Sequence, residues 1–245
     1  MPHAPRLLPA GDSAIVVEYG DGIDLALNAR VRLLHRALGA RQHAGIVETV
    51  PTYRSLMVHY DPIVLSREAI EHLIAETAER LPEETREPGR TVEIPVTYGG
   101  AAGPDLADVA AFAGLKEGQV VELHASGDYT VFMLGFMPGF PYLGGLPQRI
   151  ATPRLDTPRT LVPAGSVGIA GAQTGIYPSE SPGGWRLIGR TPVTLFDPRR
   201  SPPALLEAGD RVRFVPVTPA DCEAIARDAA AERFRPPVRQ RSAGR

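Results

Sequence analysis

Residues 135 to 190 constrain the fold of this chain more than any other stretch. Eleven of these 56 residues are glycine and eight are proline, yet aromatic and branched aliphatic side chains recur throughout the stretch. A disordered linker does not carry so much apolar surface. Glycine permits positive φ angles and close backbone approach, and proline fixes turns. The stretch is therefore predicted to fold into short strands joined by tight turns.

The charges of this stretch indicate an anionic partner. Five arginines stand against two acidic residues: Arg149, Arg154, Arg159, Arg186 and Arg190 against Asp156 and Glu180. Arg154 and Arg159 each follow a proline, which restricts the backbone and could direct two planar guanidinium groups at one carboxylate or phosphate. The alternative is a pair of arginines on a solvated turn, where isolated charges contribute little.

Composition excludes several other functions. The net charge is −2, and the only basic cluster is at residues 234–245, so nucleic acid is not an expected partner. Lys116, the single lysine, precedes Glu117, which excludes a P-loop. Cys222 is the single cysteine, so an internal disulfide is excluded and a zinc site is not expected. With no leader-like N-terminus and no run of 18 apolar residues, we expect a cytoplasmic protein that does not bind a membrane.

The first 81 residues alternate β-branched runs with amphipathic helical patterns. Residues 14–18 read as a strand, and the helix that follows is expected to begin at Asp24 and to end at Gly39. Residues 45–50 and 54–60 read as two further strands, and Ser66 caps a second helix. This order predicts an α+β sandwich, with two helices on one face of a small antiparallel sheet.

The second half of the chain has the pattern of a mainly-β domain. Asp105 is expected to cap a short helix, and a second one is expected from Lys116 to His124. A strand at 92–96 is assigned to an edge because Pro95 cannot donate a hydrogen bond. Further short strands predict a barrel or sandwich rather than a parallel α/β sheet; they are placed at residues 165–171, 184–190, 192–197 and 210–217.

Residues 82 to 90 are charged, contain two prolines and lack large apolar side chains. Such composition is typical of a domain boundary. The residues after 217 read as a helix followed by a disordered tail of about a dozen residues. We therefore divide the chain into an N-terminal domain, a barrel domain and a C-terminal tail, at residues 1–88, 89–217 and 218–245.

Polar side chains within the glycine-rich stretch predict the wall of a binding pocket. The wall comprises an amide, a phenol and three hydroxyl groups, from Gln173, Tyr177, Thr174, Ser166 and Ser181. Binding pockets are mostly apolar with a few placed polar groups, and loops on a rigid barrel commonly carry them. A glycine-rich hairpin with polar tips is the alternative. No GxSxG motif is present, so a serine nucleophile is not expected.

His124 is the histidine best placed for chemistry, because it precedes the strand that leads into residues 135–190. It could act as a general acid or base, or hydrogen-bond a substrate. It could equally stabilise the end of its helix, where a cation is favoured.

Several motifs occur in a specific order. They are GFMPGFPYLGGLP, two PR dipeptides ending at Arg154 and Arg159, VPAGSVGIAGAQTGIYP and SPGGW, with IPVTYGG, GPDL and ELH upstream and RTPVTLFD and GDRVRF downstream. Together they resemble the KipI family, also called allophanate hydrolase subunit 1 or the B-type subunit of 5-oxoprolinase. The resemblance spans residues 7 to 217 and rests on many rare turn residues, unlike a match to one short motif.

The resemblance implies a fold and a reaction. The fold is an α+β N-terminal sandwich followed by a cyclophilin-like β-barrel. The reaction is the opening of 5-oxo-L-proline to L-glutamate with hydrolysis of ATP, the expected cosubstrate. The implied partners are a larger allophanate hydrolase subunit 2 (KipA-like) chain and a LamB/YcsF-like 5-oxoprolinase chain. With no P-loop and no complete catalytic set, the chain alone is expected to be inactive.

The residues and the resemblance together predict two groups of site residues, without a metal. His124, Arg154 and Arg159 are predicted to be catalytic. The predicted substrate-binding residues are Phe136, Ser166, Gln173, Thr174, Tyr177, Gly183, Gly184, Trp185 and Arg186. For Arg186, the alternative is a salt bridge at the end of a strand.

Two other functions fit the same family. KipI itself is an inhibitor of a sensor histidine kinase, so this chain could be a regulatory binding protein. Related sequences also form part of the carboxyltransferase of urea amidolyase, although this chain has no biotinyl Met-Lys motif. We expect the 5-oxoprolinase role over both.

Overall fold

A computed structural model describes residues 5–82, 90–231 and 233–240 of the chain. The chain divides into two compact units, Met1–Glu87 and Pro88–Arg245. The described residues of the first unit form one apolar core, and those of the second form two. The predicted boundary at 82–90 lies mostly outside the described residues, and the division into three segments stays a prediction. None of the described helices is both long and apolar enough to cross a bilayer.

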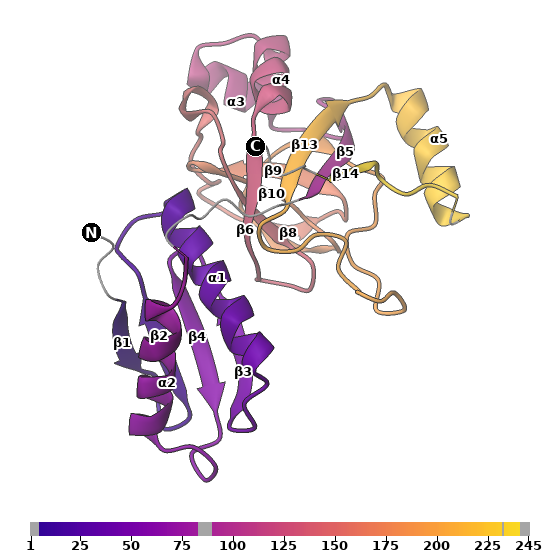
Figure 1. The fold of residues 1–245 in the computed structure, drawn as a ribbon. Helices are drawn as coiled ribbons and strands as arrows, with labels where there is room; N and C mark the ends of the chain where they lie inside the picture. Colours follow the sequence, from indigo (N-terminus) through magenta and orange to yellow (C-terminus); the bar gives the residue numbers. More distant parts are fainter. Residues whose placement is uncertain (1–4, 83–89, 232, 241–245) are drawn as a thin grey trace. The chain divides into compact units, whose positions relative to one another are not determined.

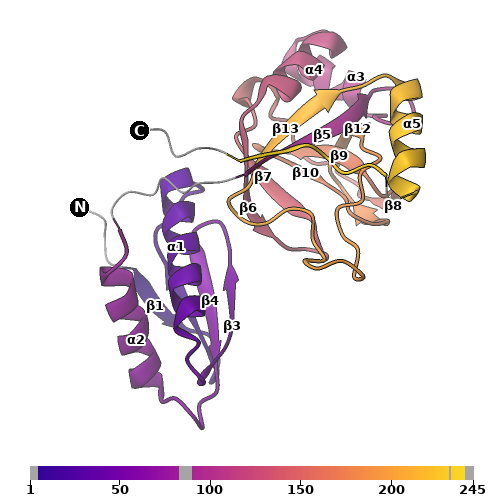
Figure 2. The same cartoon turned by 45° about the vertical axis from the view of Figure 1, so that its right-hand side comes forward.

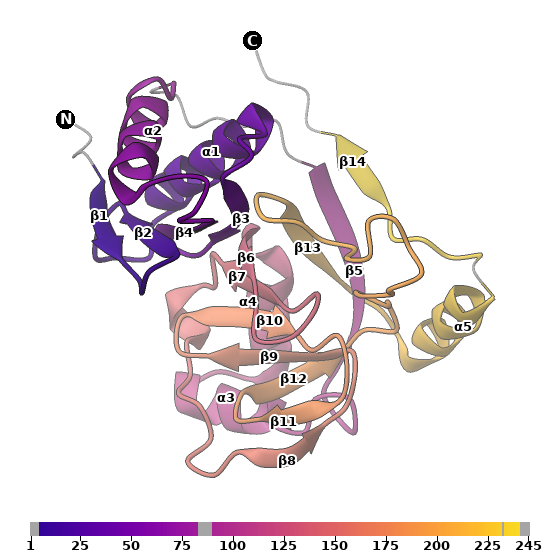
Figure 3. The same ribbon diagram turned by 90° about the horizontal axis from the view of Figure 1, so that it is seen from below.

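The first unit is a four-stranded antiparallel sheet with two helices on one of its faces (Figure 3). Alternate residues of the two central strands, among them Ile15 and Val58, point into the core beneath the helices. Leu34 and Ile70 pack on them from the helices. In the order β1-β2-β4-β3 the sheet contains β1 (Arg6–Pro9), β2 (Ala14–Glu18), β4 (Ser55–Tyr60) and β3 (Ile46–Pro51), and the helices are α1 (Leu25–Arg41) and α2 (Arg67–Glu79).

Helix α1 ends later than the sequence predicts. Asp24 caps its start by accepting hydrogen bonds from the backbone N–H groups of Ala26 and Leu27, at 2.8 and 3.1 Å. The helix then continues through Gly39, and Gln42 ends it in a left-handed conformation with φ of 45°. One glycine inside a helix costs only about 1 kcal/mol relative to alanine. The packing of the buried face of α1 outweighs that cost.

Seven strands of the second unit close into a barrel in the part of the chain that is described (Figures 1 and 2). Their order is β12-β9-β10-β7-β6-β13-β5, and pairing of β12 with β5 joins the two ends. Among the strands that the structure describes, only β5 and β13 pair in parallel. The bounds are β5 (Arg90–Tyr98), β6 (Tyr129–Leu134), β7 (Pro141–Gly144), β9 (Ser166–Ala170), β10 (Gln173–Ile176), β12 (Arg186–Arg190) and β13 (Arg211–Pro216).

Strand β5 is not the edge strand that Pro95 suggested. β13 pairs along one side of β5. On the other side, β14 pairs with residues 90–92 and β12 with residues 97–98, so Pro95 lies between the two partners. The N–H of Glu93 donates to Pro237 on this second side, and alternation along the strand directs the Pro95 nitrogen the same way. The missing N–H therefore removes no ladder hydrogen bond.

Two helices and a small two-stranded sheet pack against the barrel. Helices α3 (Leu106–Ala113) and α4 (Glu117–Ser126) pack on each other, and α4 also contacts β13. Strands β8 (Arg159–Val162) and β11 (Ser181–Gly183) form a two-stranded sheet beside β12 (Figure 3). The 3-10 helix η1 (Gln148–Ile150) contacts both α3 and α4.

The predicted strand at 192–197 does not form. The segment makes one isolated bridge, between Phe196 and Ala204. The hydroxyl of Thr191 accepts the N–H of Val193, a donor that a strand would offer to its neighbour. Without a continuous partner, a β-branched segment stays extended and irregular.

The predicted disorder of the C-terminal tail is wrong for part of it. Helix α5 (Pro219–Ala230) forms as expected, with Thr218 as its N-cap. Strand β14 (Val238–Gln240) then pairs with β5 of the barrel. Residues 241–245 lie outside the described residues.

Candidate functional site

The indole of Trp185 packs on the outer face of the barrel, where two glycines make room for it. Gly168 of β9 and Gly175 of β10 are cross-strand partners. A Cβ atom at Gly168 would lie 3.1 Å from the Trp185 Cβ, and one at Gly175 would lie 3.0 Å from the Trp185 Cζ3. Side chains at either position would push the indole away. Part of the glycine content of residues 135–190 thus has a packing reason.

Aromatic rings surround Trp185 and form a second, smaller core. Phe140 and Tyr177 meet each other edge to face, with ring centroids 5.2 Å apart, and both contact the indole. Tyr142 approaches Trp185 from a half-buried position, with centroids 6.1 Å apart. Burial raises the pKa of Tyr177, against smaller lowering effects from a hydrogen bond to the Trp185 backbone and from nearby arginine charges. Edge-to-face contacts of this kind hold rings in fixed orientations.

Arg154 lies over this aromatic surface with its charge unpaired. Its guanidinium carbon is 5.9 Å from the centroid of the Trp185 ring. The side chain is exposed, and within the described residues no carboxylate pairs with it. Stacking on a ring leaves the N–H groups at the guanidinium edge available. Arg154 is therefore the arginine of this surface that can bind an external anion.

Arg159 and Arg186, in contrast, are paired with helix α3. Arg159 donates to Asp105 at 2.6 Å, and Arg186 donates to Asp108 at 3.0 Å. The second oxygen of Asp105 accepts the backbone N–H of Leu187 at 2.7 Å. Arg159 and Arg154 still lie near enough to each other for both charges to act on Tyr177. The two predicted catalytic arginines share a surface, but Arg159 has a structural role through its ion pair with Asp105.

Asp105 has a different role from the one its position suggests. It occupies the N-cap position of α3, as predicted, but its side chain makes no capping hydrogen bond. The carboxylate is buried and connects Arg159 to the start of β12 instead. The sequence offered no signal for this, because the contact joins residues 54 positions apart.

The structure places His124 in the interior of the barrel, away from any solvent. Its Nδ1 lies 2.8 Å from the hydroxyl of Tyr98, and its Nε2 lies 3.0 Å from the hydroxyl of Thr174. The Thr174 hydroxyl donates to the carbonyl of Gly168, so it accepts from Nε2–H, and Nδ1 accepts from Tyr98. A general acid or base must reach its substrate, and this position favours a structural role instead.

The remaining predicted substrate-binding residues do not form one wall. Thr174 and Ser166 are buried in barrel strands rather than on a loop. Gln173 is half-buried and already has an interaction partner. Phe136 is 63% exposed at a turn, with φ of 68° and its ring against Phe140. The half-buried Gly183 and Gly184 lie closer to the aromatic surface, and a Cβ at Gly183 would be 2.5 Å from the Tyr177 hydroxyl.

Burial of His124 predicts a specific pH dependence of stability. It lowers the pKa of His124 from 6.5 to about 3, so the unfolded chain binds this proton first as the pH falls. The free energy of unfolding should therefore fall between pH 6.5 and about 3, by at most about 1.4 kcal/mol per pH unit from this group. Denaturant titrations at several pH values across that range should show that the free energy of unfolding of His124→Gln changes less with pH than that of the parent. Equal slopes would assign the acid sensitivity to other groups.

Within the described residues, no three His, Cys, Asp or Glu side chains come together as metal ligands. The arrangement offers instead a cation on an aromatic surface, supported by two arginine–aspartate pairs. Such a surface can bind and orient a carboxylate or a phosphoryl group.

Comparison with known proteins assigns the family. Residues 5–206 match the family model described as carboxyltransferase domain, subdomain C and D. The chain belongs to this family. Within the carboxyltransferase C and D family, it is 50% identical over 216 residues to the B-type subunit of 5-oxoprolinase from Escherichia coli O157:H7, covering 86% of this chain and 96% of the relative. The protein of the same name from Bacillus subtilis is 43% identical over 224 residues, covering 87% and 93%.

Parts of longer proteins are also similar to this chain. The crystal structure of TTHA0988 is 41% identical with a TM-score of 0.75, and the match covers 84% of this chain but only 40% of that one. Urea amidolyase of Saccharomyces cerevisiae is more distant, at 26% identity over 14% of its length. The chain thus spans nearly all of the named 5-oxoprolinase relatives and a minor part of the larger proteins.

Proposed function

We propose that this chain is the B-type subunit of an ATP-dependent 5-oxoprolinase. The observation that carries the proposal is its 43–50% identity to three bacterial proteins of that name, over 93–97% of their lengths. The urea amidolyase relatives are 26–28% identical and match only 14% of those proteins. Identity at the higher level over a whole chain favours a shared role more than a distant match to one segment does.

The function requires other chains. The relatives are each named as one component of 5-oxoprolinase, which implies an enzyme of several chains. We propose a large KipA-like chain and a LamB/YcsF-like chain as the partners. The part of TTHA0988 that this chain does not match is long enough to hold such a partner in the same polypeptide. Because the sequence has no P-loop, we place the ATP site on the complex rather than on this chain alone.

Arg154 carries the chemistry that we propose for this protein. The substrate 5-oxo-L-proline bears a carboxylate, and activation of its amide oxygen by phosphate would create further negative charge. A guanidinium fixed over Trp185 is a preorganised donor for either group. Tyr142 and Phe136 extend the apolar surface beside it, against which a five-membered ring can pack. Arg159 positions this surface through its ion pair with Asp105.

Reconstitution of the complex tests the proposal. The chain would be purified alone and with both proposed partners, and ADP release would be measured with and without 5-oxo-L-proline. We expect ADP and L-glutamate in equal amounts from the three-component mixture and no turnover from the chain alone. A mixture that assembles but never hydrolyses ATP in response to 5-oxo-L-proline would contradict the proposal. Inhibition of a sensor histidine kinase by the chain, in that case, would support the regulatory alternative.

A further inference from the structure

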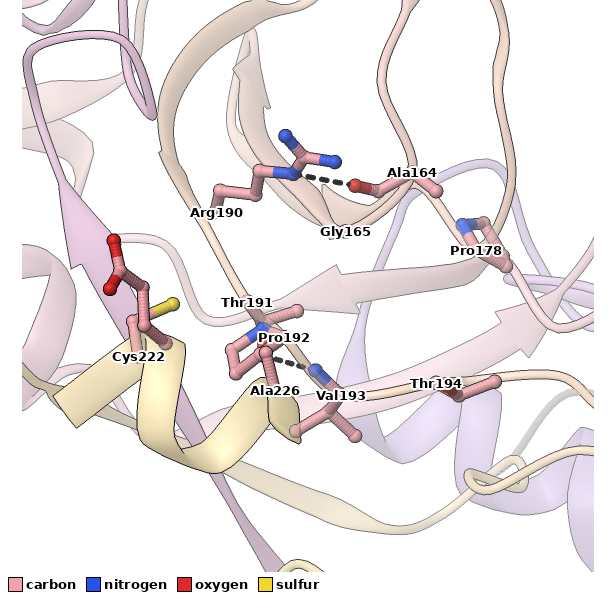
Figure 4. A pocket seen from close by; sticks show the side chains of 11 residues that line it. Ala164, Gly165, Pro178, Arg190, Thr191, Pro192, Val193, Thr194, Cys222 and Ala226 are labelled. Carbon is pink, nitrogen blue, oxygen red and sulfur yellow. Dashed lines mark hydrogen bonds between the residues drawn. The ribbon is translucent and has the colours of Figure 1, made fainter. Parts of the chain in front are cut away.

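A pocket of about 390 Å³ lies between the barrel and helix α5 (Figure 4). One wall is formed by residues 190–194, which begin at the last residue of β12, together with the turn at Ala164 and Gly165. The other wall is helix α5, through Cys222, Glu223 and Ala226. None of the residues predicted from the sequence to bind substrate lines this pocket.

Helix α5 creates the pocket by lying loosely against the barrel. No residue of α5 is fully buried, although the helix runs for 12 residues. Figures 1 and 2 both show it at the periphery of the second unit. The helix also follows residue 206, where the match to the family model ends.

The two walls carry opposite charges that do not meet. On the barrel wall, the Nε of Arg190 donates to the carbonyl of Ala164 at 2.9 Å, which leaves both Nη groups available. On the helix wall, Glu223 is exposed. Neither side chain forms a salt bridge with any other residue in the described part of the chain, and no hydrogen bond joins the two. The rest of the lining is mostly apolar, from Pro178, Pro192, Val193 and Ala226, together with Thr191 and Thr194.

We propose that this pocket binds a free α-amino acid. A guanidinium pairs well with a carboxylate, and a glutamate carboxylate pairs with an ammonium group. A ligand that carries both charges satisfies both walls, whereas a simple anion or a simple amine leaves one wall without a partner. The apolar lining accommodates a side chain, and the volume is within the range of small-molecule sites. This inference does not rest on the proposed reaction, although L-glutamate belongs to the same ligand class.

The single cysteine of the chain provides the test, because Cys222 lines the pocket. The alkylation rate of Cys222 by iodoacetamide would be measured on the full-length chain with L-glutamate, L-alanine, glutarate or propylamine. For a Kd of about 1 mM, an amino acid at about 10 mM should slow alkylation ~10-fold. Glutarate and propylamine, with one kind of charge each, should give much weaker protection.

Charge-removing variants complete the experiment. Arg190→Gln and Glu223→Gln should each abolish protection by both amino acids, while Arg213→Gln and Glu122→Gln, which change charges outside the pocket, should retain it. Circular dichroism would confirm that all four variants fold. The proposal is overturned if neither amino acid protects Cys222 at this concentration, or if glutarate protects as well as L-glutamate. Protection that survives in Arg190→Gln and Glu223→Gln would overturn it too, because binding would then lie elsewhere. The assay needs no partner chain, so its failure is separate from failure of the 5-oxoprolinase assignment.

Discussion

Replacement of Arg154 by alanine should lower kcat/KM of the reconstituted complex by about 30- to 1000-fold while the fold stays intact. The loss corresponds to about 2 to 4 kcal/mol of transition-state binding, the usual cost of removing a charge-assisted hydrogen bond from a partly desolvated site. The thermal stability of the chain should change little, since the guanidinium is exposed and contributes only one stacking contact with Trp185. Steady-state turnover and a thermal melt of each variant make the measurement.

Two further variants separate a binding role for Arg154 from a general effect of charge. Arg154→Lys keeps the charge but loses the planar fork, so a bidentate contact should recover little of the lost activity. Arg149→Ala removes an exposed arginine from the same stretch and should leave turnover unchanged. If Arg154→Ala assembles and turns over within about threefold of the parent, a difference below ~0.7 kcal/mol, Arg154 does not bind the reacting anion.

Replacement of Asp105 by alanine should destabilise the second unit by about 3 to 5 kcal/mol. The carboxylate is buried, and its removal leaves the Arg159 guanidinium without its counter-charge and the N–H of Leu187 without an acceptor. The Arg159 side chain is 30% exposed, so water compensates part of its charge, and the buried N–H of Leu187 adds the cost of an unsatisfied donor to reach this total. Denaturant unfolding followed by Trp185 fluorescence should report the loss, since Trp185 is the only tryptophan of the chain.

Asp108 provides the matched control for Asp105 on the same helix. Its carboxylate pairs with Arg186, but the side chain is 63% exposed. Exposed ion pairs contribute roughly 0 to 1 kcal/mol, so Asp108→Ala should unfold nearly like the parent. Equal effects of the two substitutions would show that the stability of this region does not depend on the buried carboxylate.

Arg159 and Arg154 differ in the same way, because only Arg159 pairs with a buried carboxylate. Arg159→Ala should lower both stability and activity, because it removes the partner of a buried aspartate. The activity of Arg159→Ala alone therefore says little about catalysis. Arg154 is the arginine whose substitution tests the anion site.

Local patterns in the sequence determined much of the fold. Asp24 and Ser66 cap their helices as their residue types predict, because capping depends on atoms within three residues. The alternation of short β-branched runs with turn residues predicted a mainly-β second half, and the barrel confirms it. The ordered motifs of residues 135–190 also identified the family, which the match over residues 5–206 confirms.

Only the tertiary structure decided what individual side chains do. The spacing of Arg154 and Arg159 suggested equal roles, but Asp105, distant in the chain, pairs with Arg159 and leaves Arg154 available. Likewise the sequence suggested a chemical role for His124, but in the structure it is buried in the barrel and both ring nitrogens have hydrogen-bond partners. Burial and charge pairing arise from contacts between residues far apart in sequence. A pattern of neighbouring residues reports helix, strand and turn, but it does not report which charge remains free.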